Sequence, residues 1–395
     1  MKIAHISDLH IGKYLKGYSL AEDQRYILKQ IVEVMKEEAP DVLLIAGDIY
    51  DKSAPSGEAF SLFDEFLGDL DELPGSLPVL IIAGNHDSPE RLDFASGFLE
   101  RHHIYISTMP PQAPDEFLKK VVLEDGSGPV NFYLLPFTRP GDLRGRLLQE
   151  GEEIRTYQEA IQYLLDRETI DWTQRNVIVS HQFYQGSTSQ TEVCDSELAR
   201  LQVGGLEVID SGILQQFDYV ALGHIHGAQQ VGKPWIRYSG TPLKYSVSEC
   251  NQRKGITIVT LEEKGMQPAI SQIPLRPLRD VRKVTGTLEE IIRMTVQEEG
   301  NLAEDYVSVA LTDDAEIYRP KEQLEKYLHH LLELELDCMR MKLETEEAED
   351  EKIRELVPQE AFAVFFEKMT GRPMHEEERA VFDRICLEAA KEVQE

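Results

Sequence analysis

The chain has 395 residues, with 41 Lys and Arg against 71 Asp and Glu, and its formal net charge is −30. At about 150 residues per domain, this length predicts two to three domains. Apolar residues make up 42% of the sequence, so the acidic excess does not indicate a disordered chain. The charge alone argues against a plain nucleic-acid binder, because phosphate backbones are normally met by Lys and Arg.

The sequence also bears on compartment. It contains no apolar run near the roughly 18 residues of a membrane span, and an acidic residue at position 8 comes too early for a secretory signal. The four cysteines are scattered without a CxxC pair, at Cys194, Cys250, Cys338 and Cys386. We therefore expect a reducing cytoplasmic compartment, no membrane contact, and thiols that serve only in packing.

Short apolar runs rich in β-branched residues recur through the first 275 residues and predict strands buried on both faces. These runs are Ile3–Ile6, Val42–Ala46, Val79–Ala83, Phe132–Leu135, Val177–Val179, Tyr219–Leu222 and Ile256–Leu261. Helices are predicted between them, from a capping box at Ser19 and Glu22 to Ala39, and at Ala59–Leu73 and Arg155–Arg167. This alternation predicts an α/β fold with a layered core over residues 1–275.

The pattern changes after Pro274 and Pro277. Strands at 281–284, 306–311 and 338–343 and helices at 288–294 and 321–332 predict a small α+β domain over residues 276–345. An acidic linker at 346–357 and a C-terminal helical tail at 358–395 are expected to follow. The aromatic stripe of the tail fits either burial against the chain's own core or docking on a partner.

Side chains that bind metal ions follow the ends of five predicted strands. They are Asp8 and His10, Asp48, Asn85 with His86, His181, and His224 with His226. Because functional crevices lie at the carboxyl ends of strands in open α/β sheets, we expect these groups to converge. Alternation along an extended segment is expected to point both members of Asp8-x-His10 and of His224-x-His226 to one side.

The types of these side chains indicate the chemistry. Carboxylate, imidazole and amide ligands without thiolate favour Mn²⁺, Fe²⁺ or Zn²⁺. Seven candidate ligands are too many for one ion, so two cations are implied, and a carboxylate between them can bridge both. Glycines at 47, 84 and 223 are expected to let the backbone turn sharply at the strand ends. A pair of cations clamping a phosphate predicts phosphoester hydrolysis.

This ordered set of motifs resembles the calcineurin-like metallophosphoesterases, and the segments 8–12, 47–51, 84–91 and 238–240 resemble the SbcD family of bacterial nucleases. The resemblance implies one metal at Asp8, His10, Asp48 and His226, and a second at Asp48, Asn85, His181 and His224, with Mn²⁺ as the favoured ion. It implies that His86 acts beside the scissile phosphate as a general acid or electrostatic group. Asp51 is expected to orient His86 through a carboxylate–imidazole pair.

The same resemblance implies a partner and a substrate. Members of this family act with an SbcC-type ATPase, as a nuclease homodimer within a heterotetramer in the bacterial cytoplasm near the nucleoid. The implied activities are ATP-dependent exonuclease action on double strands, endonuclease action on single strands, and hairpin opening, in DNA repair, recombination and replication. The 276–345 domain would cap the catalytic domain, and the tail would anchor the ATPase.

Two alternatives stay open. A phosphatase or cyclic-nucleotide phosphodiesterase is disfavoured because Lys52-Ser53 stands where protein phosphatases continue with Arg-Gly. A non-catalytic scaffold for the ATPase is disfavoured because every ligand position is kept. Lys13, Lys16 and Arg91 adjoin the metal motifs and are candidate DNA contacts, with ordinary solvated charge as the alternative. Metal ions would offset part of the acidic charge locally, so weak, salt-sensitive DNA binding by this chain alone is expected.

Overall fold

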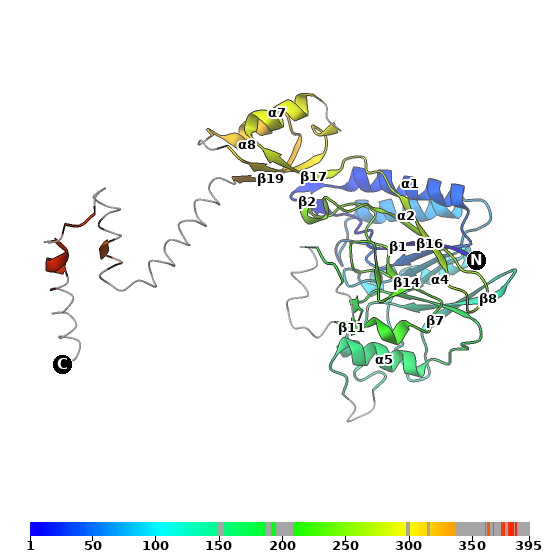
Figure 1. Ribbon diagram of the computed structural model, residues 1–395. Coiled ribbons are helices and arrows are strands. Elements are labelled where there is room, and N and C mark those ends of the chain that lie inside the picture. Colours follow the sequence, from blue (N-terminus) through cyan, green and yellow to red (C-terminus); the bar gives the residue numbers. More distant parts are fainter. Residues whose placement is uncertain are drawn as a thin grey trace. The chain divides into compact units, whose positions relative to one another are not determined.

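A computed structural model describes residues 1–148, 153–186, 191–194, 208–297, 301–313 and 317–336, with single residues and short runs between 360 and 384. It divides into two compact units, which are described separately. The first contains Met1–Lys283 with Glu304–Ser308, and the second contains Val284–Ala303 with Val309–Glu395 (Figure 1).

The first unit contains two six-stranded sheets. One has the order β16-β15-β1-β4-β5-β6. In it, β1, β4, β5 and β6 run parallel, and β15 pairs antiparallel with both β1 and β16. Its strands are β1 (Lys2–Ile6), β4 (Val42–Ala46), β5 (Val79–Ile82), β6 (Ile104–Ser107), β15 (Gly255–Thr260) and β16 (Ala269–Pro274). Every residue of β4 and β5 is buried, as the apolar runs predicted.

The second sheet has the order β13-β14-β12-β9-β8-β7. Its central pairs, from β8 through β9 and β12 to β14, are parallel, and the edge strands are antiparallel. The strands are β7 (Lys119–Asp125), β8 (Gly128–Leu135), β9 (Arg175–Ser180), β12 (Tyr219–Leu222), β13 (Gln229–Val231) and β14 (Lys233–Tyr238).

One buried apolar cluster joins the two sheets face to face. It takes Val42, Leu44 and Leu80 from the first sheet and Phe132, Leu134 and Val179 from the second. The helices α1 (Ala21–Glu38) and α2 (Gly57–Asp71) lie on the side of the first sheet, and α5 (Tyr157–Arg167) lies on the side of the second (Figure 1). The predicted layered α/β fold is therefore confirmed.

The helix ends correct one prediction. α1 begins after Leu20, whose side chain makes no cap, so the capping box at Ser19 and Glu22 does not form. α2 is capped by Ser56, whose hydroxyl accepts a hydrogen bond from the Ala59 amide at 3.2 Å. Thr156 caps α5 in the same way. The Ser19 hydroxyl, one residue before the N-cap position, accepts only a long hydrogen bond of 3.4 Å from the Ala21 amide, so it does not form the predicted reciprocal pair with Glu22.

Short elements complete the first unit. They are β2 (Tyr14–Leu15), β3 (Tyr18–Ser19), α3 (Pro89–Leu92), α4 (Ser96–Leu99), β10 (Tyr184–Gln185), β11 (Ile209–Asp210) and the 3₁₀ turns η1 (Glu100–His102), η2 (Pro140–Leu143), η3 (Ser211–Leu214) and η4 (Val247–Glu249). None of the described helices is both long enough and apolar enough to cross a membrane.

A three-stranded sheet of order β17-β18-β19 follows, formed by β17 (Val281–Gly286), β18 (Tyr306–Leu311) and β19 (His330–Leu336). The boundary between the units runs through β17 and β18. The second unit also contains α7 (Leu288–Val296) and α8 (Pro320–Leu324). The predicted helix at 321–332 is wrong beyond Leu324, where a turn follows and residues 330–332 belong to β19, whose HLLELEL segment has a two-residue period.

Three predicted segments fall wholly or largely outside the described residues: the strand at 338–343, the linker at 346–357 and most of the tail at 358–395. Within the tail, the ring of Phe362 stacks on that of Phe382, with centroids 3.8 Å apart and planes 9° from parallel. One residue from each predicted tail helix therefore makes this aromatic contact.

Candidate metal centre

The candidate ligands come together at the carboxyl ends of strands from both sheets. Asp8 and His10 follow β1, Asp48 follows β4, Asn85 and His86 follow β5, His181 follows β9, and His224 and His226 follow β12. Three overlapping groups have ligand atoms within 4.8 Å of one another: Asp8 with His10 and His226, Asp8 with Asp48 and His181, and His10 with Asp48 and His86.

The Asp48 carboxylate lies between these groups. Its Oδ2 is 3.6 Å from Nε2 of His10, 3.4 Å from Nε2 of His181 and 3.8 Å from Nε2 of His86. Its Oδ1 accepts a hydrogen bond from the His86 amide at 2.8 Å. One carboxylate therefore faces imidazoles supplied by three different loops, which is the position that a bridging ligand needs.

Asn85 connects the remaining ligands. Its side-chain oxygen lies 3.2 Å from Nε2 of His181 and 2.9 Å from Nδ1 of His224. The His224 amide donates to both oxygens of Asp8 at 3.1 Å. All seven residues predicted as metal ligands thus lie in one cluster, joined by direct contacts.

The backbone explains the convergence differently from the sequence prediction. β1 ends at Ile6, and Asp8 and His10 have φ of 54° and 43°, in the left-handed region rather than the extended one. Asp48 and His224 also have positive φ, at 50° and 99°. The expected alternation along an extended segment is therefore wrong. Positive φ at non-glycine residues is uncommon and clusters at functional sites.

Close packing, more than turning, accounts for the glycines. A side chain at Gly47, whose φ is +88°, would overlap the His181 ring, and one at Gly223 would overlap the main-chain oxygen of Ala46. That same oxygen accepts a hydrogen bond at 2.7 Å from Nδ1 of His181. Among the glycines at 47, 84 and 223, only Gly47 has positive φ. The predicted need for a glycine to turn the backbone sharply therefore holds for Gly47 and not for Gly84 or Gly223.

The cluster concentrates ionisable groups away from water. Burial raises the pKa of Asp8 to about 6, although His181 opposes the rise and Asp48 adds to it. Burial alone would also raise the pKa of Asp48, but His181 and the neighbouring imidazoles hold it well below its ordinary value. Burial would lower the pKa of His181, yet the Asp48 carboxylate raises it to about 9. The buried carboxylates of Asp8 and Asp48 therefore favour positive charge in the space between the ligands.

These residues fit a metal pair. His10 is 1% exposed, burial holds its pKa well below the ordinary value, and neither ring nitrogen has a hydrogen-bond partner among the described residues. A buried neutral imidazole with unsatisfied nitrogens is the form in which histidine ligates metal. Together with two buried carboxylates and an amide oxygen, the donor set suits Mn²⁺, Fe²⁺ or Zn²⁺.

The contact between Asp51 and His86 differs from the predicted one. Nδ1 of His86 donates to the main-chain oxygen of Asp51 at 2.7 Å. The Asp51 carboxylate faces Nζ of Lys13 at 2.7 Å and Nδ1 of His10 at 3.7 Å. The expected carboxylate–imidazole pair is replaced by a main-chain contact, because the loop after β4 presents its carbonyl to the ring.

Asp87, to which the sequence analysis assigns no role, holds two loops of the candidate site together. Its buried carboxylate accepts hydrogen bonds from the amides of Ile49 at 3.1 Å, Tyr50 at 2.9 Å and Gly84 at 2.9 Å. It thereby ties the loop carrying Asp48 to the loop carrying Asn85 and His86. Its place in the Gly-Asn-His-Asp motif was the available signal.

Glu249 and Lys254 were also missed. The fully buried Glu249 carboxylate lies 3.1 Å from Nδ1 of His226 and 2.6 Å from Nζ of Lys254, which also donates to the His226 carbonyl at 2.9 Å. Burial would lower the pKa of His226, but hydrogen bonds with Cys194 and Glu249 raise it to about 10. Carboxylates of this kind orient metal-binding imidazoles. A single Glu 23 residues beyond its histidine carries no sequence signal.

The three DNA-contact candidates lie on different local structures. Lys13 is held by Asp51 at the edge of the cluster. Lys16 is exposed in the turn between β2 and β3, and Arg91 is exposed on α3. All three are in the first unit, and Lys13 contacts Asp51, whose carboxylate lies 3.7 Å from Nδ1 of His10.

Comparison with known proteins assigns the family. A family model described as calcineurin-like phosphoesterase matches residues 1–228. Another, described as Type 5 capsule protein repressor C-terminal domain, matches residues 274–370. The chain belongs to the calcineurin-like phosphoesterase family.

Two relatives define the group within that family. The SbcD subunit of the nuclease SbcCD of Staphylococcus epidermidis is 35% identical over 338 residues, which cover 85% of each chain. The SbcD subunit of the same nuclease from Staphylococcus saprophyticus is 38% identical over 296 residues, 74% of each chain. The predicted resemblance to the SbcD nucleases is confirmed.

Proposed function

We propose that this chain is the nuclease subunit of an SbcCD-like complex and hydrolyses DNA phosphodiester bonds at a two-metal centre. The observation that carries the proposal is the position of Asp48, whose Oδ2 lies within 3.4 to 3.8 Å of three imidazoles in overlapping ligand groups. The group of nucleases to which the relatives belong supports DNA as the substrate.

The residues divide between two ions as follows. Asp8, His10, Asp48 and His226 would hold one, and Asp48, Asn85, His181 and His224 would hold the other, with Mn²⁺ as the proposed ion. When bound, the pair supplies a Lewis acid that neutralises phosphate charge and a nucleophile at neutral pH. The protein supplies the fixed ligand positions, since the loop backbones and the hydrogen bonds of Asp87 and Glu249 orient them.

His86 is the catalytic residue that we assign beside the scissile phosphate. Its Nδ1 donates to the main-chain oxygen of Asp51, so Nε2 is the nitrogen that faces the cluster. With Nδ1 as donor, Nε2 carries a proton only in the imidazolium form. That form donates to the leaving oxygen and offsets the charge that develops on it.

We extend the proposal to the domains and partners of the chain, by analogy with the SbcD nucleases. In this proposal, residues 1–275 form the nuclease domain, 276–345 the capping domain, 346–357 a linker, and 358–395 a tail that binds an SbcC-type ATPase. The complex is a cytoplasmic heterotetramer with two copies of this chain, which degrades double-stranded ends with ATP, cuts single strands and opens hairpins. The stacked Phe362 and Phe382 support a paired-helix tail.

The test is cleavage of a labelled single-stranded oligonucleotide by the full chain without ATPase. We expect cleavage that depends on Mn²⁺ and that falls about 100-fold or more in His86→Ala with metal content unchanged. His102→Ala, an exposed histidine paired with Asp71, is the matched control and should cleave normally. Hydrolysis of phosphomonoesters alone would indicate a phosphatase. Inactivity with several divalent metals would favour a scaffold.

A further inference from the structure

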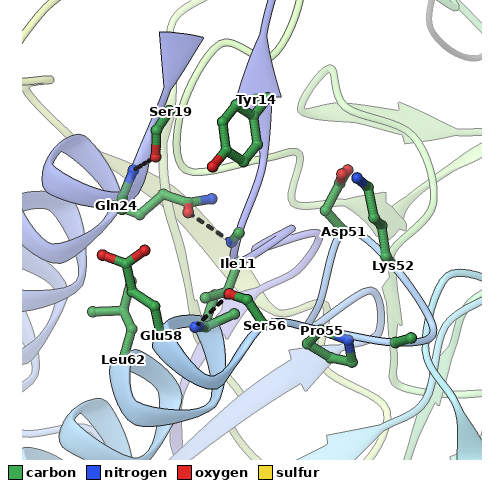
Figure 2. Close-up of a pocket in the computed structure, with 14 residues that line it drawn as sticks. Ile11, Tyr14, Ser19, Gln24, Asp51, Lys52, Pro55, Ser56, Glu58 and Leu62 are labelled. Carbon is green, nitrogen blue, oxygen red and sulfur yellow. Dashed lines mark hydrogen bonds between the residues drawn. The ribbon is translucent and has the colours of Figure 1, made fainter. Parts of the chain in front are cut away.

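A cavity of about 220 Å³ adjoins the metal centre, between the segment after β1, the start of α1 and the loop from Asp51 to the start of α2. Its floor is formed by buried Ile11, Gln24, Ala59 and Leu62. Figure 2 shows Tyr14 opposite Ser56, with Asp51 and Lys52 on one side and Glu58 and Leu62 on the other.

The cavity shares residues with the catalytic cluster. Asp51 lines it, and the carboxylate of Asp51 is 3.7 Å from Nδ1 of His10, while its main-chain oxygen holds His86. Ile11 and Gly12, also in the lining, directly follow His10 in the chain. A group bound in the cavity therefore sits next to the residues that handle the scissile phosphate.

The floor of the cavity is held in place by hydrogen bonds. The Gln24 side chain accepts from the Gly12 amide at 2.9 Å and donates to the His10 carbonyl at 2.7 Å. Ser56 is engaged in capping α2. These contacts fix the shape of the cavity before a ligand arrives, which lowers the entropic cost of binding.

The lining selects a flat, neutral group. Ile11, Pro55 and Leu62 offer apolar surface, and the Tyr14 ring at the rim is 58% exposed. The lining carries two carboxylates, those of Asp51 and Glu58, against one ammonium group, that of Lys52, and this excess of negative charge disfavours a phosphate in the cavity. The Asp51 carboxylate is paired with Lys13, whereas a carboxylate such as that of Glu58 is an acceptor for the exocyclic amino groups that cytosine, adenine and guanine carry and thymine lacks.

We propose that this cavity binds the base next to the scissile phosphate of a single-stranded DNA substrate, with Tyr14 stacking on the base and Glu58 accepting from its exocyclic amino group. The inference rests on the proposed nuclease function and adds a base-recognition site to it. Base stacking on an exposed aromatic side chain is a general device for holding single strands.

The test compares two substrates of the full chain with Mn²⁺: single-stranded oligonucleotides, and bis(p-nitrophenyl) phosphate, which has no base. Tyr14→Ala should lower the ratio of kcat/KM on DNA to that on the small diester about 10-fold, chiefly through KM. Tyr14→Trp should restore the ratio. Ala54→Trp, which fills the cavity from its exposed rim, should lower it as well.

An altered substrate gives a second measurement. An abasic site beside the cleaved bond should lower kcat/KM on DNA as much as Tyr14→Ala does. The abasic site and Tyr14→Ala together should lower kcat/KM no more than either change alone. Glu58→Ala should remove a preference for dC, dA and dG over dT at that position. Phe117→Ala, an aromatic residue of similar exposure outside the cavity, is the matched control.

The outcomes separate the two proposals. The base site is overturned if Tyr14→Ala leaves the ratio of kcat/KM on DNA to that on the small diester unchanged, or lowers kcat/KM equally on both substrates. It is also overturned if the losses from Tyr14→Ala and from the abasic site add. The nuclease proposal survives each of these results. If the wild-type chain hydrolyses the small diester and no oligonucleotide, the nuclease proposal fails, and the base site fails with it.

Discussion

The metal centre and the adjoining cavity meet at Asp51 but are built in opposite ways. The centre consists of buried polar groups, with Asp48 2% exposed and held by imidazoles from several loops. The cavity has an apolar floor and an exposed rim that includes Tyr14 and Glu58. Chemistry needs fixed charges in a dry setting, whereas recognition of a flexible strand needs accessible surface.

This difference sets an expected order of effects. A substitution in the centre should affect every phosphodiester, because it removes ligands or their supports. A substitution at the cavity should affect only substrates that carry a base. Residues between the two regions, above all Asp51, should have small and mixed effects.

The largest effect is expected for Asp48→Asn, which removes the bridging charge. We expect loss of bound Mn²⁺ and a fall of at least about 1,000-fold in hydrolysis of bis(p-nitrophenyl) phosphate. Metal content by elemental analysis and Tm with and without Mn²⁺ provide the readouts, since a ligand that binds the folded state raises Tm. Asp64→Asn, on the exposed face of α2, is the control. Retention of both metals by Asp48→Asn would contradict the bridging role.

An intermediate effect is expected for Glu249→Gln, which weakens the support of His226. Mn²⁺ affinity measured by calorimetry should fall about 10- to 100-fold. The variant should also lose about 3 kcal/mol in the free energy of unfolding, because Lys254 is left as a buried unpaired charge.

The double variant Glu249→Gln/Lys254→Met separates positioning from stability. Replacing the unpaired lysine with an apolar side chain should restore most of the free energy of unfolding while Mn²⁺ affinity stays low. If affinity recovers together with stability, Glu249 is only a structural residue.

The smallest effect is expected for Asp51→Asn. The main-chain oxygen that orients His86 is unchanged by this substitution, so kcat on bis(p-nitrophenyl) phosphate should fall less than about threefold, with the same pH profile. A carboxylate that oriented the catalytic imidazole directly would instead cost on the order of 100-fold. A fall in kcat of that size, or a shifted pH profile, would show that the Asp51 carboxylate orients His86, as predicted from the sequence.

The sequence by itself determined the strands and the residues that follow them. Strands such as β4 and β5 are continuous runs of Val, Leu, Ile and Ala, a local pattern that needs no partner to be recognised. Because parallel strands end at one edge, the order of motifs also predicted that Asp8, Asp48 and His181 meet. The HLLELEL segment shows the limit, since the predicted helix at 321–332 runs into the first three residues of this strand.

Only the tertiary structure decided how the groups are held. Asp8, His10 and Asp48 have positive φ, which their residue types tolerate better than most, but local propensity is too weak to specify it at three such positions. The roles of Glu249 and Lys254 depend on a loop that returns to His226 from far along the chain, and the Asp51 contact depends on which atom of a loop faces the ring. Residue type and spacing report which chemistry is present; the atom that makes each contact is set by long-range packing.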